Sequence, residues 1–249
     1  MSYFIFGGSG FIGTHLIALI DNLYPGTKIY NLDIVENNHE GKSTYINCDV
    51  RSEINIDIPV TSEDVIFNFA AVHRTPGHPD QAYFETNIRG AENVCAFAEK
   101  FGIKKIVFTS SIAPYGAAED LKTEETLPTP NTPYGISKLV AEKIHTIWQA
   151  KKLNERQLTI VRPGVVFGKG ENGNFTRLYW GIRGGKFFYP GRKDTIKACI
   201  YVKELVRFML YRLENHSEGV ELYNCTFESA FTIEQIVETM KKATGLQRT

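Results

Sequence analysis

Gly7-Gly8-Ser9-Gly10-Phe11-Ile12-Gly13 lies close to the N-terminus, between a short apolar run and a helical pattern. The preceding run, Ser2–Phe6, is too short for a helix and predicts a buried strand. From Thr14 to Asn22, apolar residues recur at helical spacing. The glycines therefore occupy a strand-to-helix turn, the setting in which such a motif can hold a pyrophosphate. An ordinary glycine-rich turn has the same composition, so the motif needs support from the rest of the chain.

Each glycine has a physical role in that interpretation. Gly7 permits a tight turn, Gly10 lets the backbone approach a pyrophosphate, and Gly13 lets the helix pack closely on the strand. The N-terminus of the helix that follows directs free N–H groups and a partial positive charge at the anion.

A second predicted strand, Thr27–Leu32, ends at Asp33, which lies 20 residues after Gly13. A carboxylate at this position can accept hydrogen bonds from both ribose hydroxyls of NAD, and it repels the 2′-phosphate of NADP. Asp33 on its own is also a common strand-end turn residue, and Arg51 can approach the ribose. We expect NAD to be preferred over NADP.

Composition is typical of a soluble enzyme. The 249 residues include 28 acidic and 28 basic side chains, so the net charge gives no indication of nucleic-acid binding. No apolar stretch approaches the ~20 residues of a membrane span, and a strand begins too early for a signal peptide. The four cysteines show no metal-type spacing and are expected to be reduced core residues of a cytoplasmic protein without a metal. They are Cys48, Cys95, Cys199 and Cys225.

Strand and helix patterns alternate along most of the chain, which predicts an α/β fold with a doubly wound parallel sheet covered by helices on both faces. The further predicted strands are 65–69, 105–109 and 158–161, and the predicted helices are 80–101, 133–153 and 232–244. Thr132 is the expected N-cap of the helix at 133. After Gly164 the pattern loosens. We therefore expect a cofactor-binding domain at 1–164 and mainly a small substrate-binding lobe, interleaved with the core, at 165–249.

Tyr134 and Lys138 are separated by one helical turn and share a helix face. An ammonium about 4 Å from a phenol contributes roughly 4 kcal/mol at an effective dielectric of 20, so Lys138 is expected to lower the pKa of Tyr134. The pair then forms a general acid–base unit. Ser110 and Ser111 end the strand at 105–109, and either hydroxyl can donate to a substrate oxygen or cap the strand end.

Together these motifs resemble the extended short-chain dehydrogenases/reductases, and more narrowly their NAD-dependent epimerase/dehydratase group. The resemblance implies a Rossmann fold that binds NAD, with Ser111, Tyr134 and Lys138 as the catalytic residues. It also implies a supporting helix asparagine at Asn87. The cofactor-binding residues that it implies are Gly7, Gly10, Phe11, Ile12, Gly13, Asp33, Asp49, Val50, Ala70, Ala71, Tyr134, Lys138 and Pro163.

Departures from the family pattern narrow the expected reaction. Sugar dehydratases of this type carry Asp-Glu directly after the catalytic Ser/Thr, where this chain has Ile112 and Ala113, so dehydration is not expected. An asparagine of the galactose epimerases is replaced by Val165. An arginine that clamps the substrate pyrophosphate corresponds to Lys197, which binds phosphate as a point charge.

The substrate is expected to be a nucleotide sugar held by Arg74, Ser111, Asn172, Asn174 and Lys197. His73 and Arg177 lie beside these candidates, and Arg192 is more simply a turn residue. The preferred interpretation is an NAD-dependent 4-epimerase that transfers hydride out and back. A sugar or ketone reductase and a non-catalytic NAD-binding regulatory protein are the alternatives, and the intact catalytic set argues against the second. The family also implies a homodimer formed through helices 80–101 and 133–153.

The cofactor preference gives a first testable prediction. Because the Asp33 carboxylate can bind a ribose diol and repels a phosphate, the protein should bind NAD more tightly than NADP. Dissociation constants measured for both dinucleotides check this. Equal affinities, or tighter binding of NADP, would show that Asp33 does not face the ribose.

Overall fold

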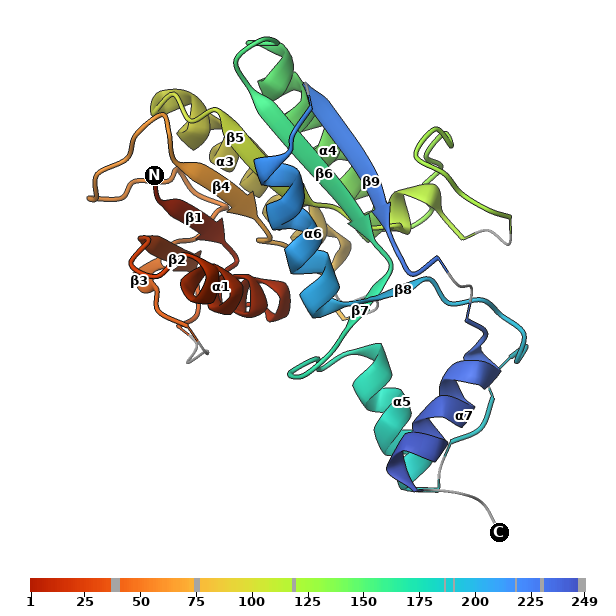
Figure 1. The fold of residues 1–249 in the computed structure, drawn as a ribbon. Coiled ribbons are helices and arrows are strands. Elements are labelled where there is room, and N and C mark those ends of the chain that lie inside the picture. The colour runs from red at the N-terminus through yellow and green to blue at the C-terminus, as the bar shows by residue number, and fades with distance from the viewer. Residues whose placement is uncertain are drawn as a thin grey trace.

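The computed structural model describes residues 1–36, 41–73, 77–117, 120–185, 187–189, 191–217, 219–228 and 231–245. Within these ranges, one sheet has seven strands in the order β3-β2-β1-β4-β5-β6-β9, and each neighbouring pair is parallel (Figure 1). The strands are β1 (Tyr3–Phe6), β2 (Ile29–Asp33), β3 (Thr44–Asn47), β4 (Val65–Asn68), β5 (Lys105–Thr109), β6 (Gln157–Pro163) and β9 (Val220–Cys225). The predicted parallel α/β fold is confirmed.

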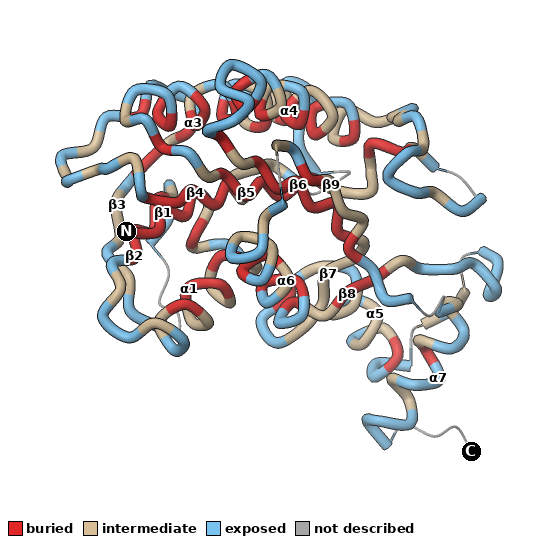
Figure 2. Tube along the Cα trace, turned by 45° about the horizontal axis from the view of Figure 1, so that its top comes forward, coloured by how far each residue is buried: buried red, intermediate tan, exposed pale blue. Residues whose placement is uncertain are grey.

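Helices cover both faces of this sheet (Figure 2). Helices α3 (Arg89–Lys100) and α4 (Pro133–Ala150) lie on one face, and α1 (Phe11–Leu23) and α6 (Val202–Glu214) lie on the other. Strand side chains alternate between the two layers because successive residues point to opposite faces. In β1, for example, Phe4 packs towards α3 and Ile5 towards α1.

The helix predicted at 80–101 contains a local widening. It consists of α2 (Asp80–Tyr83), the π-turn η1 (Phe84–Ile88) and then α3. A π-turn inserts one residue into the helical ladder and is frequent near functional sites. Here it contains Asn87, whose buried amide bonds to residues outside the helix.

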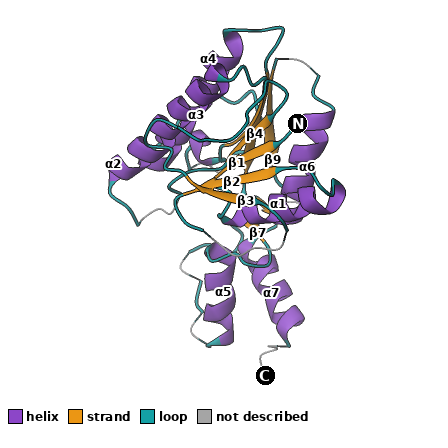
Figure 3. Cartoon of the chain, turned by 90° about the vertical axis from the view of Figure 1, so that its left-hand side faces the viewer, coloured by secondary structure: helices purple, strands orange, loops and turns teal. Residues whose placement is uncertain are grey.

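Beyond residue 164 the chain contributes to two regions. Strands β7 (Val165–Phe167) and β8 (Cys199–Tyr201) form a small parallel sheet. Helices α5 (Asn174–Arg183) and α7 (Ile233–Thr244) extend away from the main sheet (Figures 1 and 3), whereas α6 and β9 belong to its layers. The boundary at 164 stays a prediction. None of the helices in the described part combines the length and apolar content that a membrane span requires.

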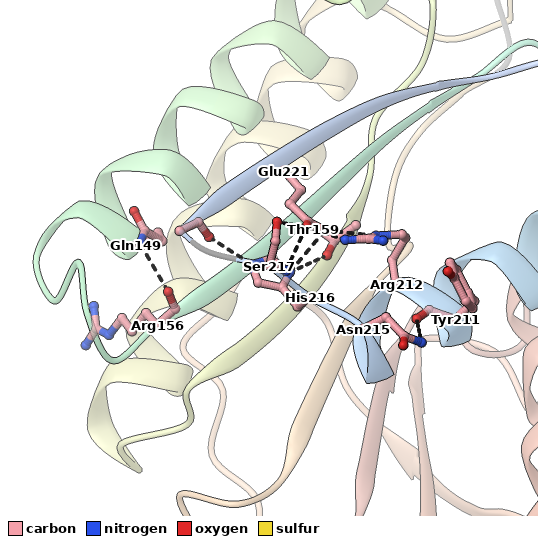
Figure 4. A network of polar contacts seen from close by, with 10 residues as sticks. Gln149, Arg156, Thr159, Tyr211, Arg212, Asn215, His216, Ser217 and Glu221 are labelled. Carbon is pink, nitrogen blue, oxygen red and sulfur yellow. Dashed lines mark hydrogen bonds and ion pairs between the residues drawn. The ribbon is translucent and has the colours of Figure 1, made fainter.

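A polar network joins β9 to the end of α6 at the amino edge of the sheet (Figure 4). The Glu221 carboxylate accepts hydrogen bonds from Arg212 Nη2 at 2.5 Å, from the Ser217 amide at 3.0 Å and from its hydroxyl at 2.7 Å. His216 Nδ1 lies 3.2 Å both from Glu221 Oε2 and from Thr159 Oγ1 on β6. The network therefore fixes the edge strand β9 to β6 and α6.

This network predicts a pH-dependent contribution to stability. Burial alone would raise the pKa of Glu221, but hydrogen bonds from Arg212 and Ser217 lower it to about 2. A carboxyl whose pKa is depressed by folding stabilises the protein above its ordinary pKa, and this stabilisation is lost as the pH falls towards 2. The Glu221→Gln variant should therefore lose about 2 kcal/mol of unfolding free energy at pH 7 and almost none near pH 2. Urea denaturation at both pH values measures this, and an equal loss at both would contradict it.

Candidate active site

The carboxyl ends of the central strands open into a cleft of about 1450 Å³. Small-molecule pockets typically measure roughly 300–1,000 Å³, so the cleft has room for a dinucleotide and a substrate together. The predicted site residues that line it are Gly7, Gly10, Phe11, Ile12, Gly13, Asp33, Asp49, Val50, Ala70, Ala71, Ser111, Tyr134, Lys138, Pro163, Asn172 and Asn174. Segments distant in the sequence thus meet at this edge of the sheet, as the motifs predict.

The glycine-rich turn leaves open the space that a pyrophosphate needs. Gly7 has φ +77°, and a Cβ there would lie 2.6 Å from the Ala70 amide nitrogen. A Cβ on Gly13 would lie 2.6 Å from the Gly8 Cα, so close packing of α1 against the turn requires glycine. Gly10 is the N-cap of α1 and supplies no side-chain cap, which leaves the N–H groups of the first turn able to bind an anion. These residues fit NAD.

Asp33 is held in place by the turn that it faces. One carboxylate oxygen accepts a hydrogen bond from the Ser9 amide at 3.1 Å, and the other accepts one from the Val35 amide at 3.3 Å. Arg51 lines the same cleft, but its guanidinium binds Asp49 through two nitrogens and lowers the pKa of that carboxyl. Arg51 is thus already paired with an anion, a geometry that favours NAD over NADP.

Helix α4 places Tyr134 and Lys138 beside the end of β5. Thr132 Oγ1 accepts the Gly135 amide at 3.1 Å, so the predicted N-cap is confirmed. The Lys138 side chain is buried, and its Nζ donates to the Thr109 carbonyl at 2.5 Å and lies 4.5 Å from the Phe108 ring centroid. The Ser111 hydroxyl accepts the Ala113 amide at 3.1 Å and is hydrogen-bonded to the Tyr134 phenol.

The pKa values differ from the sequence-based expectation. Burial raises the pKa of Tyr134, and the Ser111 hydrogen bond opposes this only in part. Burial also lowers the pKa of Lys138 to about 7, with Glu142 acting in the opposite direction. The prediction that Lys138 lowers the pKa of Tyr134 is therefore wrong for the protein chain alone. The cost of burying both groups outweighs the expected charge effect, and Lys138 directs its charge at a backbone carbonyl.

Asn87 connects two segments of the site. Its amide oxygen accepts the Val72 N–H at 2.8 Å, and its amide nitrogen donates to the Val72 carbonyl at 3.0 Å and to Ser137 Oγ at 2.8 Å. The loop after β4 is thereby tied to α4, between Tyr134 and Lys138. Its position behind the cleft fits the supporting role that the resemblance implies.

The predicted substrate residues are not all brought together. Asn172 and Asn174 line the cleft at the start of α5, and Asn174 Oδ1 accepts a hydrogen bond from Arg177 at 2.6 Å. Lys197 is exposed and outside the cleft lining, with its amide bonded to the Phe231 carbonyl. Arg74 lies outside the described residues. The roles predicted for Asn172, Asn174, Lys197 and Arg74 stay predictions.

Further residues of the cleft were missed by the sequence analysis. Lys169 and Glu171 belong to a glycine-rich loop that lines it, and Glu171 binds the amide and hydroxyl of Thr176 in the first turn of α5. The cluster of glycines at 168–173 was the available signal. Within the described ranges, no group of three or more His, Cys, Asp or Glu residues can hold a metal ion.

Comparison with known proteins agrees with this geometry. Residues 3–226 match the model of the NAD dependent epimerase/dehydratase family. The N-acetyl-alpha-D-glucosaminyl-diphospho-ditrans,octacis-undecaprenol 4-epimerase of Escherichia coli O157:H7 is 35% identical over 239 residues, which cover 96% of this chain and 71% of that protein. The UDP-glucose 4-epimerase of Bacillus subtilis (strain 168) is 27% identical, over 98% of this chain and 83% of the relative.

Solved structures show the same fold at lower identity. MoeE5 in complex with UDP-glucuronic acid and NAD superposes with a TM-score of 0.85 at 23% identity, covering 98% of this chain and 83% of MoeE5. The match in fold extends over almost the whole chain, including the region after residue 164. The family model, the 35% identical relative and the cleft together show that this chain belongs to the NAD-dependent epimerase/dehydratase family.

Proposed function

We propose that this protein is an NAD-dependent 4-epimerase acting on a hexose that is linked through a diphosphate. The observation that carries the proposal is the convergence of Ser111, Tyr134 and Lys138 on the cleft that contains the glycine-rich turn. Ile112 and Ala113, where related dehydratases carry two carboxyl groups, lie outside the cleft lining. The site thus has a proton-transfer group and lacks, at these two positions, the acid that dehydration requires.

In the proposed reaction, Tyr134 removes the proton of the substrate hydroxyl and returns it at the end of the cycle. Ser111 hydrogen-bonds to Tyr134 and can donate to the same substrate oxygen. Lys138 lies four residues from Tyr134 on the same face of α4 and lines the cleft beside it. Bound NAD would supply reversible hydride transfer at the carbon that bears this hydroxyl. The glycine-rich turn, Asp33 and Lys138 would hold the NAD.

The substrate class follows from what the relatives are named for. The Escherichia coli relative is named for a sugar diphosphate on an undecaprenyl lipid, and the Bacillus subtilis relative for UDP-glucose. A hexosyl diphosphate is common to both. Asn172, Asn174 and Arg177 at the start of α5 are proposed to contact it, because they line the cleft beyond the cofactor segments. A homodimer through α3 and α4 remains part of the proposal, supported by Ile136 and Ile147, two exposed apolar side chains of α4.

The proposal is tested with a panel of UDP-, dTDP- and GDP-hexoses and a polyprenyl-diphosphate-linked N-acetylhexosamine. At least one should give its C4 epimer without added reductant and without a change in mass, and the productive compound identifies the carrier. A product lighter by one water would overturn the proposal in favour of dehydration. Consumption of one NADH per product would overturn it in favour of a reductase.

The role of Tyr134 gives a separate prediction. The Tyr134→Phe variant removes only the hydroxyl, so the fold and the affinity for NAD should be kept while turnover falls by roughly 10²–10⁴-fold. Turnover and NAD affinity are measured beside Tyr211→Phe, a control at an exposed position of α6. Turnover close to wild type in the Tyr134 variant would remove Tyr134 from the mechanism.

A further inference from the structure

A buried ionic cluster lies directly behind the catalytic helix. Glu142, on α4, accepts hydrogen bonds from Arg162 Nε at 2.8 Å, from Arg162 Nη2 at 2.6 Å and from Ser110 Oγ at 2.5 Å. All three residues are at most 3% exposed. One carboxylate is therefore shared by α4, the end of β5 and the end of β6.

The positions of its partners connect this carboxylate to the site. Ser110 itself lines the cleft beside Ser111, and Arg162 precedes Pro163, which also lines it. Glu142 itself is four residues after Lys138, which is four after Tyr134, so the three side chains share one face of α4. The Arg162 guanidinium also lies 4.7 Å from the Tyr115 ring centroid, which holds it from the other side.

Stability alone does not account for such a pair. Taking two charges out of water costs several kcal/mol per ion, and apolar residues of similar volume are often as stable in their place. Arg162 moreover keeps one nitrogen, Nη1, buried without a hydrogen-bond partner. A buried pair with an unsatisfied group, placed between three parts of an active site, indicates a functional contribution.

The charges around Lys138 show what that contribution is. The titratable and charged groups on the packed elements are Tyr134, Glu142 and His145 on α4, Arg162 on β6, Tyr83 on α2 and Tyr115 after β5, while β5 presents the Thr109 carbonyl and the Phe108 ring. His145 is buried and its pKa is lowered to about 4 by burial, so it is neutral near pH 7. Among the described groups, the Glu142 carboxylate is the one that raises the pKa of Lys138 against the effect of burial.

We propose that Glu142 is a positioning residue for the reaction: its carboxylate locks the ends of β5 and β6 onto α4 and is the counter-charge that keeps Lys138 an ammonium. The catalytic consequence rests on the roles proposed above for Tyr134 and Lys138. The effect of the Glu142 charge on the pKa of Lys138 does not rest on those roles, and it can be measured without a substrate.

The experiment is an NMR titration of the protein carrying ¹³C-labelled lysine, with every variant in the same cofactor state. The Lys138 signal is assigned by its loss in Lys138→Met. The Glu142→Gln variant keeps the shape of the side chain but removes its charge. In this variant the titration midpoint of Lys138 should fall by about one pH unit from the wild-type value near 7. Glu142→Asp, which keeps the charge, should lie closer to wild type. An unchanged midpoint in Glu142→Gln would overturn the proposal.

The control is Glu99→Gln, which removes the surface ion pair with Lys151 at 2.9 Å between α3 and α4 and should leave the midpoint unchanged. If Glu142→Gln does not fold, Glu142→Met/Arg162→Met is compared with Arg162→Met, which keeps the carboxylate. The midpoint should be lower in the double variant, and equal midpoints would overturn the proposal. With a substrate in hand, the alkaline limb of kcat/KM should move to lower pH, because activity is lost as Lys138 deprotonates. If kcat falls in Glu142→Gln while the alkaline limb of kcat/KM and the titration midpoint of Lys138 stay unchanged, Glu142 has only a structural role.

Discussion

Parallel pairing of the strands brings their carboxyl ends to one edge of the sheet, and the site depends on this constraint. The turn after β1, Asp33 at the end of β2, the alanines after β4, Ser111 after β5 and Pro163 at the end of β6 all meet at that edge. In an antiparallel sheet, alternate strand ends would lie at opposite edges. The same segments would then be separated by the length of a strand.

The elements that carry local signals were predictable from the sequence. The strand at 105–109 and the capped helix beginning at Pro133 follow from apolar patterning and turn chemistry, and they place the serine and the tyrosine correctly. Strand β9 and helix α6 were not predicted within the loosened region after Gly164. Strand β9 combines apolar and polar side chains. It pairs with β6 and is tied to α6 by contacts such as Glu221 with Arg212, which no local pattern encodes.

Properties set by burial were also beyond the sequence. The spacing of Tyr134 and Lys138 indicates that they share a helix face, but not that burial raises one pKa and lowers the other. Asn87, in the π-turn, forms hydrogen bonds with Val72 and Ser137, which come from two other segments of the chain. Glu142 continues the four-residue spacing of Tyr134 and Lys138, but its burial against Arg162 is known only from the structure.

The distribution of acids along the cleft limits the chemistry that it can complete. The carboxyl side chains that line its described part are Asp33, Glu36, Asp49 and Glu171. Asp33 and Asp49 are bound by backbone amides or Arg51, and Glu171 binds the first turn of α5. The groups that act on the pKa of Tyr134 are Ser111 and Tyr83, and no carboxylate is among them. A group that takes a proton from a hydroxyl and returns it suffices for epimerisation, whereas expulsion of a different hydroxyl as water needs a second acid beside that leaving group.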